Sequence, residues 1–479
     1  MGAINQKCQV PTPREIVVQM LDQVGYHENL YGKRVLENSC GTGNFLIEIV
    51  ERYIKDCLKQ EKSGDEIRKG IQRDIHGFEK DRRLHKLCIQ NLTCVVEKFG
   101  LSDIHWNIKR RNALYASKRR RYQFVIGNPP YLAYPELDND TRKYLRAHFK
   151  SCAKGKPDYY YAFVENAINA LADDGKLAYL VPGNFMKNLH SETLRQLLLP
   201  SLSKIIDYSH QKLFDKYLTS SVILLCNCNC RMDTVRYEDK HYKHTLQMPK
   251  TAMQGKWIFE EQVYIHDAVY FAECFHASAP VATQLNRAFV LQDWNERQEG
   301  FLQCGIYTIE NPVAWDAAGP KAMQQGLREK IIFPYTYNEQ GNLIRYQENL
   351  FREQFSGAYT YLLQFQNALQ KRKADIQAAW FEYGRSQLLS HLKQEKLILS
   401  TFVTERPRVY LLTDRSVPYA GICVIANQGY TVRQAQMVLE SMEFMDYVRK
   451  IGVCTNGTSY RISPRDINLF RFSRVLLGG

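Results

Sequence analysis

An Asn-Pro-Pro-Tyr tetrad at residues 128–131 carries the side chains whose types and order best suit chemistry in this chain. The Asn128 amide oxygen is a hydrogen-bond acceptor, and the Pro129 carbonyl is a second one. Two acceptors that face one point suit an –NH2 group. Tyr131 adds a flat aromatic face on which a heterocycle can stack, an interaction worth about 1–3 kcal/mol per base in nucleic-acid sites. These groups predict a clamp for the exocyclic amine of a base. The alternative is a proline-stiffened turn whose Tyr fills a surface groove.

The apolar run ahead of the tetrad must position it. Residues 124–127, Phe-Val-Ile-Gly, have the composition of a buried strand. The two prolines end that strand, because proline has no N–H and a fixed φ. In an open α/β sheet, ligands bind at the carboxyl ends of the strands. The tetrad is therefore expected at the ligand-binding edge of such a sheet.

A glycine-containing loop lies between a strand and a helix further upstream. The strand ends at Glu37, the loop Asn-Ser-Cys-Gly-Thr-Gly-Asn spans residues 38–44, and the apolar segment 45–50 follows as a helix. Gly41 and Gly43 let the backbone approach a ligand closely. Leu46 occupies the third glycine position of the GxGxxG fingerprint, so pyrophosphate binding is disfavoured.

Two acidic residues flank this loop in the expected fold. Glu37 stands four positions before the first glycine, where an acid suits an amine-bearing ligand. Glu79 closes the next strand, residues 75–79, and can bind both hydroxyls of a ribose. One acid near an amino-acid group and one at a ribose fit S-adenosylmethionine. Glu79 can also be read as a solvated acid at a strand end.

The tetrad and the acid–glycine loop–acid pattern together resemble the gamma-group N6-adenine DNA methyltransferases of restriction–modification systems, the TaqI type. That group places the cofactor motif first, the catalytic tetrad second and a target-recognition region last, which is the order in this chain. The loop reads Glu-Asn-Ser-Cys-Gly where the family usually has Asp-Pro-Ala-Cys-Gly, so the acid is kept.

The resemblance implies further cofactor contacts. Thr12-Pro13 resembles the segment that covers the methionine end of the cofactor, although Thr12 also fits an N-cap with Glu15 completing a capping box. Asn112-Ala113 stands where the family usually has an Asp that contacts the cofactor adenine, and Phe163 matches an aromatic residue beside it. The implied cofactor-binding set is Thr12, Glu37, Asn38, Cys40, Gly41, Gly43, Glu79, Asn112, Ala113, Asn128, Pro130 and Phe163.

The resemblance also implies direct transfer of a methyl group to a flipped-out adenine. Tyr131 would stack on the base, with Phe214 as a second aromatic residue. Asn128 and Pro129 would accept the two N–H bonds and align the amine lone pair with the methyl group. The reaction requires no metal. Phe163 and Phe214 can also be read as ordinary core aromatics.

The charge of the chain points to a polyanionic partner. The formal net charge is +14 and the pI is about 9.0, which fits the double-stranded DNA that the resemblance implies as partner. Seven basic residues with no acid among them lie just ahead of the tetrad, and they either meet a phosphate backbone or form a solvated face. They are Lys109, Arg110, Arg111, Lys118, Arg119, Arg120 and Arg121.

The 13 cysteines show no secreted-protein pattern, and the sequence has no signal peptide or apolar run of membrane-spanning length. These features predict a cytoplasmic protein with reduced thiols, and the resemblance implies a bacterial or archaeal one. Cys226, Cys228 and Cys230 alternate along a strand, and zinc is disfavoured because its ligands usually come as CxxC pairs. The Cys40 thiol is expected to pack rather than react.

A chain of 479 residues is too long for one ordinary core. The resemblance implies an α/β fold in which residues 1–230 form a Rossmann-like class I methyltransferase domain, a mainly parallel twisted sheet with helices on both faces. Residues 231–285 are expected to connect it to an α+β target-recognition domain at residues 286–479.

Two segments of the second domain suit DNA contacts. Residues 359–373 have helical spacing and a basic end, and residues 380–387 place aromatics beside Arg and Gln. Lys371, Arg372 and Arg385 are therefore predicted to bind DNA. A hydrophobic plug under a turn is the alternative for residues 380–387.

Other functions share the tetrad. It also serves enzymes that methylate glutamine amides in release factors and some that methylate RNA bases, although the glutamine enzymes are generally shorter. A non-catalytic DNA-binding subunit is disfavoured by the intact tetrad. Glu238-Asp239-Lys240 is the only nuclease-like pattern, and fewer than 15 residues precede Thr12. A cognate restriction endonuclease is thus expected on a separate chain, and the protein itself as a monomer.

Overall fold

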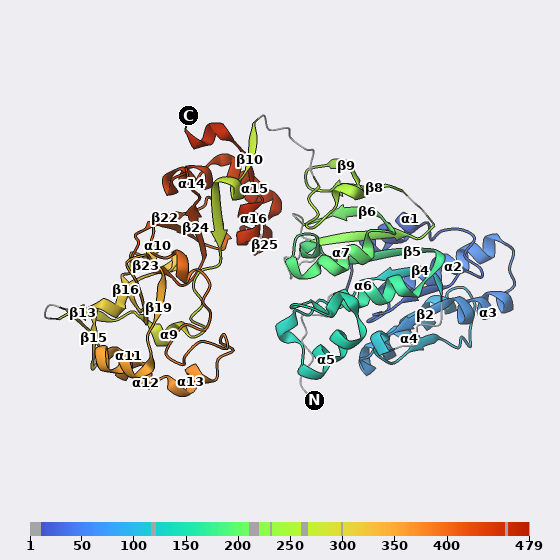
Figure 1. Ribbon diagram of the computed structural model, residues 1–479. Helices are drawn as coiled ribbons and strands as arrows, with labels where there is room; N and C mark the ends of the chain where they lie inside the picture. Colours follow the sequence, from blue (N-terminus) through green and yellow to red (C-terminus); the bar gives the residue numbers. More distant parts are fainter. Residues whose placement is uncertain are drawn as a thin grey trace. The chain divides into compact units, whose positions relative to one another are not determined.

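The computed structural model describes residues 11–115, 121–209, 220–229, 232–259, 267–297, 300–455 and 458–478 (Figure 1). The chain divides into two compact units, residues 1–262 and 263–479, which are considered separately below. Among the helices in the described ranges, none is both long enough and apolar enough to cross a membrane.

A nine-stranded sheet forms the centre of the first unit, in the order β3-β2-β1-β4-β5-β7-β6-β8-β9 (Figure 1). β3, β2, β1, β4 and β5 are parallel, whereas β7 is antiparallel to both β5 and β6. The strands are β1 (Val35–Glu37), β2 (Ile75–Phe78), β3 (Asn107–Lys109), β4 (Tyr122–Gly127), β5 (Leu171–Pro182), β6 (Leu202–Asp207), β7 (Ser221–Asn227), β8 (Thr234–Asp239) and β9 (His244–Pro249). The mainly parallel sheet predicted from the sequence is confirmed.

Helices cover both faces of this sheet. One core joins the sheet to α1 (Arg14–Val24), α2 (Asn44–Lys59), α3 (Gly64–Asp74) and α4 (Arg82–Glu97). The other joins it to α5 (Asn139–His148), α6 (Tyr159–Ala170) and α7 (Glu192–Leu198). In β4, Phe124 and Ile126 belong to the first core and Val125 to the second. This alternation explains why β4 is apolar at successive positions: a strand buried on both faces has no solvent side.

The strand order reverses between β1 and β4. The chain moves outward from β1 through β2 to β3 and then returns to the other side of β1 as β4. Val35 pairs with Phe124 and Leu36 with Val125, so the loops that follow the two strands leave the same edge of the sheet. Such a reversal opens a crevice at the carboxyl ends of the strands, which is where α/β folds bind ligands.

The expected connecting segment at residues 231–285 is not a connector. β8 and β9 pair with each other, and β8 also pairs with β6, so residues 234–249 extend the first sheet. Residues 275–278 instead pair with β24 (Ile422–Ala426) of the second unit. The predicted boundaries at residues 230 and 285 were therefore wrong, because strand pairing with distant segments decides which unit each segment joins.

The second unit is α+β, as expected. Its sheets have the orders β11-β24-β20-β22, β12-β17-β16-β23, β13-β14-β15, β21-β26-β25, β10-β27 and β18-β19. The strands are β10 (Ala268–Tyr270), β11 (Phe275–Ser278), β12 (Val290–Leu291), β13 (Trp294–Glu296), β14 (Phe301–Cys304), β15 (Tyr307–Glu310), β16 (Ala314–Ala318), β17 (Glu329–Ile332), β18 (Tyr335–Tyr337), β19 (Leu343–Arg345), β20 (Lys396–Leu399), β21 (Phe402–Val403), β22 (Val409–Leu412), β23 (Ser416–Pro418), β24 (Ile422–Ala426), β25 (Val453–Thr455), β26 (Ser459–Arg461) and β27 (Arg471–Ser473). The helices are α8 (Phe271–Cys274), α9 (Asn286–Phe289), α10 (Pro320–Gln324), α11 (Glu348–Gln354), α12 (Ser356–Leu363), α13 (Gln366–Gln370), α14 (Val432–Leu439), α15 (Met442–Ile451) and α16 (Pro464–Asn468).

Candidate active site

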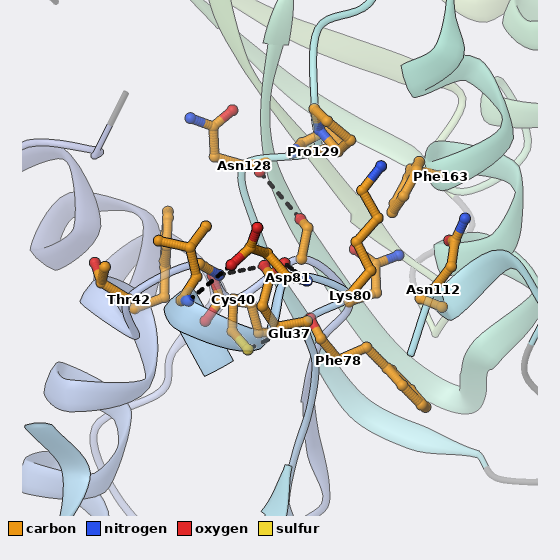
Figure 2. Close-up of a pocket in the computed structure, with 18 of the residues that line it drawn as sticks. Glu37, Cys40, Thr42, Phe78, Lys80, Asp81, Asn112, Asn128, Pro129 and Phe163 are labelled. Carbon is orange, nitrogen blue, oxygen red and sulfur yellow. Dashed lines mark hydrogen bonds between the residues drawn. The ribbon is translucent and has the colours of Figure 1, made fainter. Parts of the chain in front are cut away.

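A cavity of about 440 Å³ opens at the carboxyl ends of β1, β2 and β4 (Figure 2). The loop after β1, the acid after β2 and the tetrad after β4 all contribute to its wall. The structure therefore brings together most of the residues singled out in the sequence, namely Thr12, Glu37, Asn38, Cys40, Gly41, Glu79, Asn112, Ala113, Asn128, Pro129, Pro130, Tyr131 and Phe163.

The Glu79 carboxylate holds the glycine loop in place. Its Oε2 accepts the Gly41 N–H at 3.0 Å, and its Oε1 accepts the Asp81 N–H at 2.7 Å. Gly41 has a φ of 52°, in the left-handed region that favours glycine. Glu79 is thus a structural acceptor of the loop and not simply a solvated acid at a strand end.

Gly43 has a different role from the one expected. It is not among the described residues that line the cavity. It precedes α2 with a φ of 94°, and a Cβ at this position would lie 3.0 Å from the Cys88 Sγ. Gly43 therefore allows the turn into α2 and its close packing against α4, and its contact with the cofactor stays a prediction.

Glu37 is a buried acid at the cavity wall. It is only 2% exposed, and its Oε2 has no hydrogen-bond partner among the residues described. Burial, reinforced by the neighbouring Cys88 and Glu79, raises the pKa of the Glu37 carboxyl well above its usual range. A buried acceptor without a partner costs about 1–3 kcal/mol. An amine placed in this cavity would supply the missing donor and favour the carboxylate.

Glu37 also lies directly against the strand that carries the tetrad. A Cβ added at Gly127 would lie 3.3 Å from the Glu37 Cγ. The glycine at the end of β4 therefore allows the acid after β1 to pack beside it. Asn38, which follows Glu37, is likewise 2% exposed and lines the cavity.

Aromatic residues surround one end of the cavity. In Figure 2, Asn112 and Phe163 lie toward one end of the view and Thr42 toward the other. The Asn112 Nδ2 donates to the Tyr159 hydroxyl at 2.9 Å, and the Leu114 N–H donates to the Asn112 Oδ1 at 3.1 Å. Tyr159 packs edge-on against Phe163 at 5.2 Å. This end offers flat apolar surfaces suited to a heterocycle.

Several lining residues were missed in the sequence. Phe78 directly precedes Glu79, and the Arg111 guanidinium stacks on its ring at 5.6 Å. Tyr159 begins a run of three tyrosines, and none of the three was predicted as a site residue. Only Phe163, two residues after that run, was predicted. The position of Phe78 beside a predicted site acid was a usable signal. The lining residues not predicted are Pro11, Ser39, Thr42, Asn44, Phe45, Phe78, Lys80, Asp81, Leu84, Arg111, Leu132 and Tyr159.

The tetrad is anchored through both its backbone and its side chains. The Ser39 hydroxyl donates to the Asn128 carbonyl at 3.1 Å, which ties the tetrad to the glycine loop. The Tyr131 hydroxyl donates to the Leu180 carbonyl at 2.8 Å, and the ring meets Tyr160 edge-on at 6.2 Å. Desolvation raises the pKa of Tyr131, so its hydroxyl remains a donor. The hydrogen bond to Leu180 of β5 thus fixes the orientation of the Tyr131 ring.

The Asn128 side chain is held at one end only. Its Nδ2 donates to the Thr12 Oγ1 at 3.1 Å, whereas its Oδ1 is buried with no partner in the described part of the chain. The capping box predicted for Thr12 and Glu15 is not formed. Pro13 is the N-cap of α1, and no side chain caps that end in the residues described. Thr12 lies one residue too early to cap, so its hydroxyl is available to Asn128.

The remaining residues of the first unit follow their local packing. The Cys40 Sγ lies 3.4 Å from the Phe78 carbonyl, and a hydrogen bond with Cys88, together with burial, raises the pKa of the Cys40 thiol. This thiol packs rather than reacts, as expected. Within the residues described, no three His, Cys, Asp or Glu side chains are grouped to hold a metal. Phe214, Cys230 and the basic residues 118–120 lie outside the described residues.

The basic run near the tetrad serves several purposes. Lys109, Arg110 and Arg111 are exposed, and Arg111 reaches the cavity wall. Arg121 is also exposed but donates to the Leu171 carbonyl at 3.0 Å, which braces the start of β5. The first three residues therefore present positive charge near the cavity.

In the second unit, Lys371 and Arg385 are exposed, but Arg372 is not free to bind DNA. Its Nε donates to the Leu369 carbonyl at 2.9 Å, and its Nη2 donates to the carbonyls of Trp380 and Glu382, both at 2.8 Å. Its Nη1 donates to the Thr283 carbonyl. The predicted DNA contact of Arg372 was wrong, because the N–H groups of its guanidinium donate to backbone carbonyls of three segments.

The strand order, the antiparallel β7 between β5 and β6, and a ligand cavity at the reversal point together define the class I methyltransferase fold. Residues 39–214 match the family model of the Eco57I restriction-modification methylase. The resemblance to DNA methyltransferases of restriction–modification systems, expected from the sequence, is thereby confirmed.

Individual relatives extend this comparison. The type II restriction enzyme and methyltransferase RM.Eco57I of Escherichia coli is 22% identical over 534 residues, covering 90% of this chain and 53% of its own length. The type II methyltransferase M.HincII of Haemophilus influenzae is 32% identical over 216 residues, covering 44% of this chain and 35% of its own. This chain thus spans about half the length of RM.Eco57I.

One solved structure resembles most of the chain. The type IIL restriction-modification enzyme MmeI, in complex with DNA, superposes with a TM-score of 0.57 at 12% identity. The match covers 95% of this chain and 65% of that one. At this identity the similarity establishes the fold, and it includes both units.

Proposed function

We propose that this protein is a site-specific DNA adenine N6-methyltransferase of the gamma group, which acts in a restriction–modification system. The proposal depends on one observation: the Asn-Pro-Pro-Tyr tetrad and the acid–glycine loop–acid residues line a single cavity. The family match over residues 39–214 supports a methylase. The choice of adenine rests on the amine-binding character of the tetrad and on its resemblance to the gamma-group motif.

S-adenosylmethionine is the proposed cofactor, and the cavity residues fit it. The buried Glu37 carboxyl, whose Oε2 has no partner in the described chain, suits an ammonium group. The Glu79 oxygens accept backbone N–H groups but keep further lone pairs for ribose hydroxyls. Phe78 and Phe163 offer surfaces for the adenine ring. When bound, this cofactor supplies an electrophilic methyl group.

The tetrad would activate the target amine by position. The adenine amine is a poor nucleophile, because its lone pair is delocalised into the ring. The Asn128 Oδ1 and the Pro129 carbonyl would accept its two N–H bonds, which favours a tetrahedral nitrogen and aims the lone pair at the methyl group. Tyr131 would hold the extruded base by stacking, with its ring fixed through Leu180. The displaced proton would pass to solvent after transfer.

The second unit is proposed to recognise the DNA target. Lys371 and Arg385 are exposed cations that can contact phosphates or base edges. Arg372 would support this surface indirectly, because its hydrogen bonds to the carbonyls of Trp380 and Glu382 hold the backbone of that segment in place. The net charge of +14 supports a duplex partner. A cognate restriction endonuclease is the proposed partner activity in the restriction–modification system.

The test is to express this chain in a bacterial host without adenine methylation and to map modified adenines across the genome. We expect methylation at one short sequence motif. The Asn128→Ala variant, produced at the same level, should leave that motif unmodified. Unmodified DNA together with labelled methyl in RNA or protein would refute DNA methylation and assign the same cavity to another substrate.

A further inference from the structure

The catalytic role proposed for Asn128 depends on which way its amide points. One end of the amide is an acceptor and the other is a donor, and the two ends exchange places on a half-turn of the side chain. In one orientation an incoming amine meets an acceptor. In the other it meets an NH2 group and is repelled. The protein therefore needs a partner that fixes the orientation before the base arrives.

We propose that Thr12 is the positioning residue that fixes the Asn128 amide. The Thr12 Oγ1 accepts from the Asn128 Nδ2 at 3.1 Å, across a separation of 116 residues. The Asn128 Oδ1 is left buried without a partner in the described chain, at the wall of the cavity. The nitrogen end is thus engaged and the oxygen end remains available. This inference rests on the proposed function.

Thr12 is itself held from the glycine loop. It is 5% exposed, and its carbonyl accepts from the Asn44 Nδ2 at 3.3 Å. The Asn44 Oδ1 in turn accepts from the Thr42 hydroxyl at 3.0 Å. These three residues and Asn128 thereby form a hydrogen-bonded series from the glycine loop to the tetrad, which passes through the backbone carbonyl and the hydroxyl of Thr12. The loop that lines the cofactor end of the cavity also determines where the Thr12 hydroxyl lies.

The tetrad backbone is fixed from the same loop. The Ser39 hydroxyl donates to the Asn128 carbonyl at 3.1 Å. With the backbone held by Ser39 and the amide nitrogen by Thr12, the side chain has little freedom to turn. A threonine hydroxyl can also donate its own hydrogen while it accepts one. Thr12 can therefore contact an acceptor in the cavity without releasing Asn128.

The test compares Thr12→Val, which removes the hydroxyl with little change in shape, and Thr12→Ser, which keeps it. We expect Thr12→Val to slow single-turnover methyl transfer to duplex DNA roughly 10- to 100-fold, the range for a lost hydrogen bond and a misplaced group. The calorimetric affinity for DNA should change less than about threefold, and the affinity for the cofactor should fall by a smaller factor than methyl transfer does. Thr12→Ser should restore transfer to within about threefold of the parent.

A second readout follows the amide directly. The Asn128 side-chain resonances can be assigned in selectively 15N-labelled protein by their loss in Asn128→Ala. They should shift or broaden in Thr12→Val and stay unchanged in Thr12→Ser. In the Asn128→Ala background, Thr12→Val should slow transfer no further, because the two residues act as one unit. Should Thr12→Val fail to fold, Thr12→Ala serves in its place.

The outcomes separate this inference from the proposed function. Parental transfer by Thr12→Val, in an enzyme that methylates DNA, would overturn the positioning role and leave the proposed function intact. Equal losses of transfer and of cofactor affinity would also overturn it, since Thr12 would then act as a binding residue. If the parent protein methylated no DNA, the proposed function would fail, and unchanged Asn128 resonances in Thr12→Val would overturn the amide contact independently.

Discussion

Replacing Glu79 by Ala tests whether one carboxylate both shapes the glycine loop and binds the cofactor. The substitution removes two accepted bonds, from the N–H groups of Gly41 at 3.0 Å and of Asp81 at 2.7 Å. A hydrogen bond to a charged group contributes about 1.5–3 kcal/mol. The freed N–H groups can reach water in the cavity, so the lower end of the range applies to each. The free energy of unfolding should therefore fall by about 3 kcal/mol without cofactor.

Cofactor affinity should fall as well. Loss of the proposed ribose contact predicts binding weaker by about 1–3 kcal/mol, or roughly 5- to 150-fold. The measurements are urea unfolding of the cofactor-free protein and calorimetric titration. A cofactor analogue without ribose hydroxyls separates the two roles. If Glu79 binds the hydroxyls, the parent loses affinity for the analogue, whereas Glu79→Ala binds analogue and cofactor equally.

Ser63→Ala provides the matched control. Ser63 and Glu66 form the capping box of α3, and Ser63 is not among the described residues that line the cavity. Removing the cap should cost about 0.5–2 kcal/mol of stability with no change in cofactor affinity. Unchanged stability in Glu79→Ala would refute the loop-holding role. Unchanged affinity would remove Glu79 from the cofactor site.

Three further predictions address the tetrad, the buried acid and the second unit. Asn128→Ala should lower single-turnover methyl transfer by several orders of magnitude with little change in either affinity, whereas Tyr131→Ala should weaken the emission rise of a fluorescent base analogue at the target position. Because burial raises the pKa of Glu37, its carboxyl stays protonated at pH values where a glutamate is ordinarily ionised. A cationic ligand must displace that proton. Cofactor binding should therefore release protons and tighten as pH rises toward the raised pKa, as calorimetry in buffers of different ionisation enthalpy would measure, and Glu37→Gln should remove this effect. Lys371→Ala and Arg385→Ala should each weaken DNA binding and lower the salt slope by about one.

Each of these has a contrary outcome. Parental transfer by a folded Asn128→Ala protein would end the catalytic interpretation of the tetrad, and an unaltered emission rise in Tyr131→Ala would remove the ring from the base site. Cofactor binding by the parent with no buffer-dependent enthalpy would show that Glu37 is already ionised. A salt slope identical to the parent in both second-unit variants would place the DNA-binding surface elsewhere.

The parts of the site that depend on contiguous residues could be predicted without the structure. A buried apolar strand that ends in two prolines places Asn128 and Tyr131 at a sheet edge wherever the strand lies in the sheet. The loop between Glu37 and α2 is likewise local, since its glycines and the helix after it are consecutive in the chain. The mainly parallel sheet was expected from the family resemblance, and it agrees with the unbroken apolar run of β4, because a strand with no polar alternation must be covered on both faces.

Which distant groups meet depends on how the whole chain packs. Thr12 and Asn128 are 116 residues apart, and Arg372 and Thr283 are 89 apart. Their partners could not be read from spacing, because hydroxyl, amide and guanidinium groups bond to any suitable atom that the fold brings near. An N-cap and a DNA contact were reasonable local expectations for Thr12 and Arg372, and the packed chain overrode both. Strand pairing did the same for residues 234–249, whose short alternating strands join the first sheet through contacts with β6. The chemical groups of the site could thus be identified from consecutive residues, whereas the orientation of each group depends on which segments pack together.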